Sequence, residues 1–200
     1  MGHKSNTPLL QIVVPLFVNH PSLYPIVGKF FYSLKENYPD IPVIVVDDCS
    51  PLPHYFPVTI QNKTNLGFTR TINKGLKEAF KKADIVVVLN DDLVIHNGSL
   101  DKFFYIKGLT IASVQDSAGT NDDMFGSNFA LTREVYELLG GYNEKYRNYF
   151  SDRDYYNKAI ENGVEIVKYF DIVLEHMESA TFKHLDKKKL FSEDHLKFLS

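Results

Sequence analysis

The feature that most constrains the fold is a set of continuous apolar runs that alternate with segments of helical periodicity. Residues 10–16 (LQIVVPL) and 42–48 (PVIVVDD) are rich in β-branched residues and lack polar alternation. Such runs are typical of strands covered on both faces, as in a parallel sheet. Between them, apolar residues recur at spacings of three and four from Leu23 to Leu34, which indicates an amphipathic helix. Together these segments predict a βαβ unit.

The same alternation continues along the chain. The predicted strands are 58–62, 84–90, 109–115, 125–132 and 164–170, and the predicted helices are 67–82, 133–139 and 152–162. Thr132 can cap the helix that follows it, and Gly140 can end that helix. We therefore expect an α/β fold with a Rossmann-like, mostly parallel central sheet flanked by helices.

The length of 200 residues fits one domain with a sizeable core. We expect residues 1–200 to form that single domain, with a nucleotide-binding half at about 10–95, a second half at about 96–180 and a charged tail at 181–200. Ligands of open α/β sheets bind at the carboxyl ends of the strands, so that edge is where a site is expected.

Composition excludes several classes of function. The formal net charge of −3 gives no basic field, which disfavours nucleic acid as a partner. The single cysteine, Cys49, excludes an internal disulfide framework and a multi-cysteine zinc site. No apolar run approaches the roughly 18–20 residues that span a bilayer. We expect a soluble, cytoplasmic protein that at most attaches to a membrane surface.

Acidic residues follow two of the predicted strands. Asp47 and Asp48 end the strand 42–48, and Asp91 and Asp92 follow Asn90 at the end of the strand 84–90. Adjacent carboxylates can hold a divalent cation, and the cation can hold a diphosphate. The alternative is that both are polar turns with capping side chains.

Two further groups are candidates for chemistry. Asp152 and Asp154 follow two aromatic residues and open a predicted helix, where one of them is expected to be a general base or both are simple helix caps. His176 follows a strand-like segment. It would be a metal ligand if it lies beside Asp92, and otherwise an ordinary core or surface histidine.

The order of several motifs resembles the family 2 glycosyltransferases. The matching segments are VVPLFVN (13–19), VVDDCS (45–50), NLGFTRTINKGL (65–76), VVVLNDD (86–92), GSNFALTREVYELLGGYNE (126–144), YFSDRDYYNKA (149–159) and VLEHMES (173–179). The resemblance covers roughly residues 10–180. It implies the GT-A fold and an inverting transfer of a sugar from a nucleoside diphosphate sugar to a hydroxyl group. A UDP-sugar is the expected donor, and a glycan, a lipid-linked glycan or a protein is the expected acceptor.

The resemblance also implies roles for individual residues. The nucleotide would be bound by Pro15, Phe17, Asp47 or Asp48, Asn65, Gly67 and Asp91. A Mn²⁺ or Mg²⁺ ion would be held by Asp92 and by His176, which contacts the metal or the diphosphate. Asp152 would be the catalytic base, in the half of the chain that receives the acceptor.

Two departures from the family pattern leave alternatives open. Asn90 stands in place of the first aspartate of the metal motif, and Ser151 in place of the usual acidic residue before the base. A non-catalytic module that binds a nucleotide or glycan is therefore one alternative, and a nucleotidyltransferase is another.

The tail, residues 181–200, has two interpretations of its own. Its lysines and apolar residues would contact an anionic membrane, or it would form a helix folded back on the domain.

Overall fold

The computed structural model describes residues 8–116, 119–121, 126, 128–177 and 181–199. The strands are β1 (Leu10–Leu16), β2 (Val43–Asp47), β3 (Ile60–Gln61), β4 (Ile85–Leu89), β5 (Leu93–Val94), β6 (Leu109–Asp116), β7 (Gly119–Asn121), β8 (Asn128–Thr132) and β9 (Ile166–His176). The α-helices are α1 (Leu23–Asn37), α2 (Phe68–Ala79), α3 (Arg133–Leu139), α4 (Ser151–Glu161) and α5 (Lys187–Phe198), and two 3₁₀ helices span Asp101–Tyr105 and Thr181–His184. None of these helices is both long and apolar enough to span a membrane.

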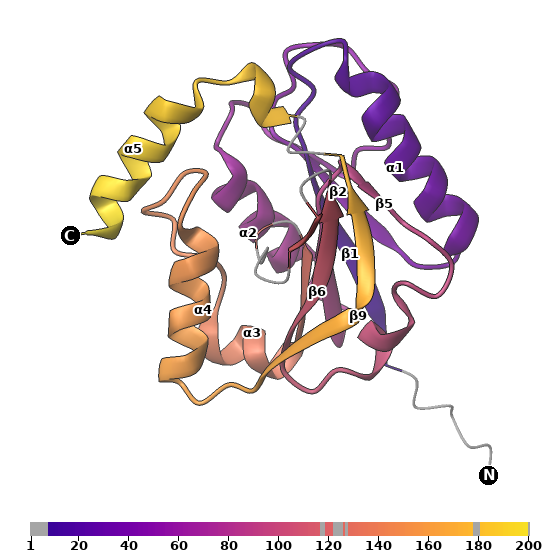
Figure 1. The fold of residues 1–200 in the computed structure, drawn as a ribbon, viewed down its shortest axis with the longest axis vertical. Coiled ribbons are helices and arrows are strands. Elements are labelled where there is room, and N and C mark those ends of the chain that lie inside the picture. The colour runs from indigo at the N-terminus through magenta and orange to yellow at the C-terminus, as the bar shows by residue number, and fades with distance from the viewer. Residues whose placement is uncertain (1–7, 117–118, 122–125, 127, 178–180, 200) are drawn as a thin grey trace.

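All of the described strands join one sheet (Figure 1). Their order is β3-β2-β1-β4-β8-β6-β9-β5, with β7 paired to β6. The pairs β1–β2, β1–β4, β2–β3 and β6–β9 are parallel. Because β8 runs antiparallel to both of its neighbours, β4 and β6 point the same way. Of the described strands, only β5, β7 and β8 run opposite to the others. The expected mostly parallel sheet is therefore confirmed.

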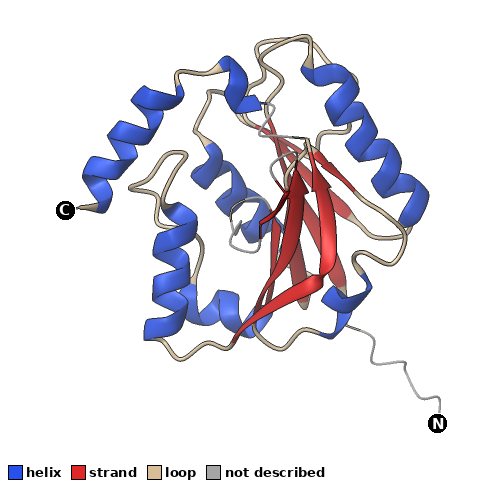
Figure 2. Cartoon of the chain, in the orientation of Figure 1, coloured by secondary structure: helices blue, strands red, loops and turns tan. Residues whose placement is uncertain are grey.

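Helices cover both faces of the sheet (Figure 2). On the α1 face, Val14 and Val87 belong to a core that includes Phe30 of the helix. On the opposite face, Val13 and Val88 pack with residues of α2, α3 and α4. This two-sided burial explains why the central strands read as unbroken apolar runs, since neither face of the strand meets water.

The point that positions a site is the reversal of strand order beside β1. This strand pairs with β2 on one side and with β4 on the other. The chain therefore adds β2 and β3 on one side of β1 and then adds β4 on the opposite side. The carboxyl ends of β1 and β4 consequently lie next to each other without a helix crossing between them. Such a switch point is where ligands bind in open α/β sheets.

Most of the predicted elements are confirmed, and the differences lie at their ends. The Oγ1 of Thr132 accepts the N–H of Val135, and α3 ends at Gly140, both as predicted. The predicted strand 58–62 shortens to β3, and the predicted strand 164–170 extends to His176. Of the predicted strand 125–132, residues 125 and 127 lie outside the described residues. The tail forms α5 and packs against the loop that precedes α4.

Candidate functional site

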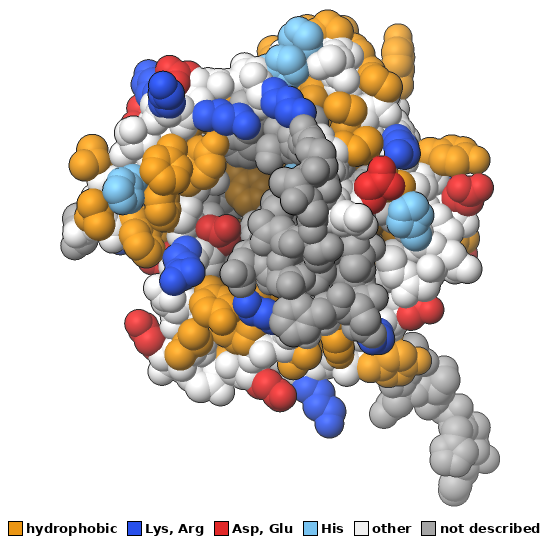
Figure 3. All heavy atoms as spheres, viewed as in Figure 1, with side chains coloured by type: hydrophobic (Ala, Val, Ile, Leu, Met, Phe, Trp, Pro, Cys, Tyr) orange, Lys and Arg blue, Asp and Glu red, His pale blue; other side chains and the backbone are white. Residues whose placement is uncertain are grey.

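A cavity of about 600 Å³ lies at the carboxyl ends of β1 and β4. Its hollow is visible on the face shown in Figure 3, where basic side chains stand on one part of the rim. The predicted site residues that line it are Pro15, Phe17, Asp48, Asn65, Gly67, Asp91, Asp92, Asp152 and His176. Segments that are far apart in sequence are thus brought together as the motifs predicted.

His176 is held beside Asp92 by the short strand β5. In the pairing of β5 with β9, Leu93 lies opposite His176, and the N–H of Met177 donates to the backbone oxygen of Asp92 at 2.8 Å. The His176 Nε2 consequently lies 3.2 Å from the Asp92 Oδ1, and both side chains are buried. The spatial pairing that a shared metal site requires is therefore present.

The electrostatics of this cluster favour a cation. Burial raises the pKa of Asp91 well above its ordinary value, and the negative charge of Asp92 raises it further. Among the buried atoms of the described residues that have no hydrogen-bond partner are the Asn90 Oδ1, the Asp91 Oδ2 and the His176 Nδ1. Because buried polar atoms are nearly always satisfied, unpartnered oxygens beside a carboxylate pair fit a site that a positive ligand completes.

The donor set is also chemically suitable for Mn²⁺ or Mg²⁺. The described residues contain no group of three His, Cys, Asp or Glu side chains arranged around one point. Ions such as Mg²⁺ are commonly held by one or two carboxylates together with substrate phosphates and water. Asp92 and His176 therefore fit an ion that arrives with a diphosphate.

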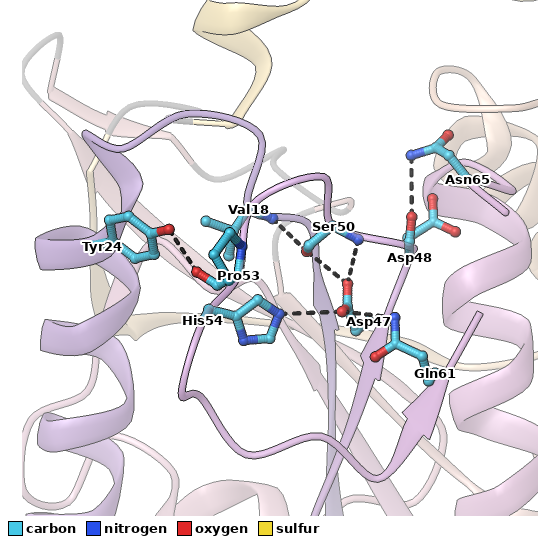
Figure 4. A network of polar contacts seen from close by, with 9 residues as sticks. All are labelled: Val18, Tyr24, Asp47, Asp48, Ser50, Pro53, His54, Gln61 and Asn65. Atoms are coloured by element: carbon cyan, nitrogen blue, oxygen red, sulfur yellow. Dashed lines mark hydrogen bonds and ion pairs between the residues drawn. The ribbon is translucent and has the colours of Figure 1, made fainter. Parts of the chain in front are cut away.

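Asp47 and Asp48 point to different surroundings (Figure 4). The carboxylate of Asp47 accepts hydrogen bonds from Ser50, from Gln61 and from the ring of His54, and Asp47 does not line the cavity. Asp48 does line it. Of the two residues predicted to bind the nucleotide base, Asp48 is the one that reaches the cavity, whereas Asp47 fixes the turn that follows β2.

Asp48 also shapes the start of α2. Its two carboxylate oxygens accept the N–H groups of Leu66 and Gly67, each at 2.8 Å. Gly67 has φ +86°, and a Cβ there would lie 2.7 Å from the backbone oxygen of Arg147. Glycine is therefore required, both for its backbone conformation and for this close approach. The Arg147 guanidinium donates to the Asn65 Oδ1 at 2.6 Å, which holds Asn65 at the cavity wall.

Asp152 and Asp154, the two candidates for the catalytic base, differ in what their side chains contact. Asp152 lies in the first turn of α4, lines the cavity and borders Gly126, where a Cβ would lie 3.0 Å from the Asp152 Oδ2. Asp154 is outside the cavity lining, and its Oδ1 accepts the hydroxyl of Tyr146 at 3.1 Å. Of the two, Asp152 is therefore the one that lines the cavity.

Some cavity residues were missed by the sequence analysis. They come from the loop before α4 and from the tail: Arg147, Tyr149, Phe150, Leu185, Lys187 and Leu190. The run of aromatic and charged residues at 145–150 was a signal for the first group. No pattern in the tail indicated that it reaches the cavity, since α5 has little amphipathic character.

A family model described as glycosyl transferase family 2 matches residues 11–105. This segment contains the switch point and the residues Asn90 to Asp92, so the match covers the half of the site that is expected to bind the nucleotide. No curated protein matches the chain in sequence.

Several solved structures share the fold. GalNAc-T7 with UDP, GalNAc and Mn²⁺ matches at a TM-score of 0.68 and 13% identity, over 86% of this chain and 44% of that one. The mannosyltransferase PcManGT from Pyrobaculum calidifontis, in complex with GDP-Man and Mn²⁺, matches at 0.66 and 15% identity, over 98% of this chain and 65% of that one. TarS from S. aureus in complex with UDP matches at 0.62 and 15% identity, over 83% of this chain and 59% of that one. The chain spans less than two thirds of each of these proteins, and at these identities the likeness establishes the GT-A fold.

Proposed function

We propose that this chain, a family 2 glycosyltransferase by its family match and its GT-A fold, transfers a sugar from a nucleoside diphosphate sugar to an acceptor hydroxyl group. One observation carries the proposal. A single cavity at the switch point brings together the carboxylates after β4, His176 and Asp152. We further propose that residues 1–200 act as one domain, because β4 of the first half pairs directly with β8 of the second.

The nucleotide is proposed to lie along the wall formed by the ends of β1 and β2 and the start of α2. Phe17 offers an apolar face, and Asp48 and Asn65 offer hydrogen-bonding oxygens at the same wall. Asp91 is proposed to accept a hydroxyl of the ribose or of the donor sugar. UDP is the proposed nucleotide, since GalNAc-T7 and TarS were solved with it, and GDP is the first alternative, since PcManGT holds GDP-Man.

The diphosphate is proposed to lie next to Asp92 and His176, the residues that would hold Mn²⁺ or Mg²⁺. A cation held there would offset the negative charge that develops on the departing diphosphate. The His176 imidazole would add a ligand or a hydrogen bond without adding negative charge to the cluster. Asn90 supplies an uncharged oxygen where a third carboxylate would increase the repulsion with Asp91 and Asp92.

Asp152 is proposed to act as the general base. It lies in the first turn of α4, where the N-terminus of the helix carries a partial positive charge. As the acceptor oxygen bonds to the anomeric carbon, the hydroxyl proton passes to Asp152 and the bond to the diphosphate oxygen breaks. Such a single displacement inverts the configuration at the anomeric carbon. The acceptor is proposed to be a glycan, a lipid-linked glycan or a protein side chain.

Measuring nucleotide release from UDP- and GDP-sugars with Mn²⁺ tests this function. Asp152→Asn should lower turnover by about 10²–10⁴-fold, the usual contribution of a general base. Asp154→Asn is the matched control, since it makes the same change one half-turn away, outside the cavity, and keeps an oxygen for the Tyr146 hydroxyl. Equal losses in the two variants would remove Asp152 from the role of base.

The same measurement separates the two alternatives. Nucleotide binding with no turnover on any donor would indicate a non-catalytic module. Release of pyrophosphate from a nucleoside triphosphate would indicate a nucleotidyltransferase instead.

We also propose that the protein is cytoplasmic and that its tail attaches it to a membrane surface. Lys187, Lys188 and Lys189 are exposed on α5, together with Leu196. Co-sedimentation with anionic vesicles that is lost when the three lysines become glutamine would support it. Equal sedimentation of that variant would refute it.

A further inference from the structure

The helix α5 carries a buried carboxylate that the proposed chemistry does not use. Asp194 is fully buried, although its helix lies at the surface. Its two oxygens accept the N–H of Arg147 at 2.9 and 3.0 Å, and one of them also accepts the N–H of Asn148 at 2.7 Å and of Tyr149 at 3.0 Å. Three consecutive backbone donors thus converge on one side chain.

Consecutive N–H groups that point to one spot form a concave site for an anion. Here Asp194 supplies the anion from within the chain, and the Nζ of Lys197 lies 2.9 Å from it. Charge-assisted hydrogen bonds of this kind are stronger than neutral ones. Asp194 therefore fixes the backbone of residues 147–149, rather than only adding to the packing of α5.

Aromatic contacts add a second link between α5 and the same loop. Phe150 has φ +65°, a left-handed conformation that is uncommon for a bulky residue. Its ring stacks on those of His195 and Phe198, at centroid distances of 5.4 and 5.1 Å. Strained backbone of this type persists only where the surrounding structure holds it. Side chains of α5 supply that support one residue before α4 begins.

The loop of residues 147–150 connects the two sides of the cavity, the start of α2 and the start of α4. The backbone oxygen of Arg147 accepts the N–H of Thr69 at 3.1 Å, and the Asn148 Oδ1 accepts the N–H of Phe68 at 3.1 Å. Both donors belong to the first turn of α2, on the proposed nucleotide side. At its other end the loop leads directly into Ser151 and Asp152.

We propose that Asp194 is a positioning residue, which holds the loop 147–150 so that Asp152 points into the cavity. The inference rests on the proposed role of Asp152 as the base. It implies that α5 is part of the working site, although Asp194 itself touches no substrate.

The test compares Asp194→Asn with Asp186→Asn. Asp186 caps α5 by accepting the N–H of Lys189, so its variant removes one carboxylate from the same helix without touching the loop. In Asp194→Asn, an amide NH₂ group would face backbone donors. NMR-detected exchange of the amides of 147–149 should then be about 10- to 100-fold faster, the range for a lost hydrogen bond to a charged acceptor. Asp194→Glu restores the charge and should recover part of the protection.

Turnover is the second measurement. The kcat of Asp194→Asn should fall roughly 10- to 100-fold, as expected for a displaced catalytic group, while KM for the donor changes little. Thermal unfolding of each variant establishes that the protein compared is folded. Asp186→Asn should keep both the slow exchange of these amides and the wild-type kcat.

Each result decides one step. Unchanged exchange in Asp194→Asn would overturn the anchoring of the loop, whatever the activity. Faster exchange with unchanged kcat, or an equal loss of kcat in Asp186→Asn, would overturn the positioning role. If the wild-type protein transfers no sugar at all, the proposed function fails, and the exchange rates still show whether Asp194 holds the loop.

Discussion

Replacing Gly67 by alanine tests the junction between the start of α2 and the loop that precedes α4. Gly67 has φ +86° and ψ 167°, a region that is essentially restricted to glycine. A Cβ there would lie 2.5 Å from the Arg147 Cγ and 2.7 Å from the Arg147 backbone oxygen. That oxygen accepts the N–H of Thr69, so it cannot move away without loss of a hydrogen bond.

The expected loss of stability has two parts. The backbone conformation contributes about 1–3 kcal/mol. Displacement of Arg147 contributes about 1–3 kcal/mol more, as for an extra methyl group in a well-packed site. Gly140→Ala isolates the first part, because Gly140 has φ 70° and ψ −156° and none of the described residues would lie within 4 Å of its Cβ.

Urea denaturation of both variants gives the two free energies of unfolding. We expect Gly67→Ala to lose about 2–6 kcal/mol and Gly140→Ala about 1–3 kcal/mol. Nucleotide binding, measured under conditions where each variant is folded, should weaken only in Gly67→Ala. Equal losses of stability in the two variants would refute the close approach of Arg147 to Gly67.

Two further predictions concern the residues around the proposed base. Gly126→Ala would bring a Cβ to 3.0 Å from the Asp152 Oδ2. The kcat should therefore fall about 10-fold or more, with little change in the urea midpoint. An unchanged kcat would contradict this placement of Asp152. For Asp194, burial by itself would raise the pKa, but hydrogen bonds from Asn148, Tyr149 and Lys197 hold it below its ordinary value. A carboxylate with a lowered pKa stabilises the fold above its unfolded pKa of about 3.9 and loses that contribution as pH falls through the folded value. The difference in unfolding free energy between wild type and Asp194→Asn should therefore be largest near neutral pH and shrink below about pH 4, and a difference that is independent of pH would contradict it.

Much of the first half of the chain, which is proposed to bind the nucleotide, could be predicted from local patterns. The mostly apolar run of β1 and the unbroken apolar run of β4 have few alternatives to buried parallel strands, and α2 has a clear apolar face. Because strand ends in such a sheet share an edge, the placement of Asp48, Asp91 and Asp92 followed from the fold class alone.

The parts that were missed depend on contacts between distant segments. The strand β5 has two residues, too short for a periodic signal, yet it sets the register that places His176 beside Asp92. Asp47 and Asp48 are adjacent in sequence, and only side-chain direction decides which one reaches the cavity. The left-handed backbone of Phe150 depends on the packing of α5, which no local propensity encodes.

The central claim is that the cluster after β4 binds a nucleoside diphosphate through a divalent cation. Calorimetric titration of the protein with UDP and with GDP, each with Mn²⁺ and again with EDTA, tests it most directly. We expect one nucleotide to bind in Mn²⁺ and not in EDTA, and Asp92→Ala to abolish that binding although the variant stays folded. No binding of either nucleotide, or binding that neither EDTA nor Asp92→Ala weakens, would contradict the claim.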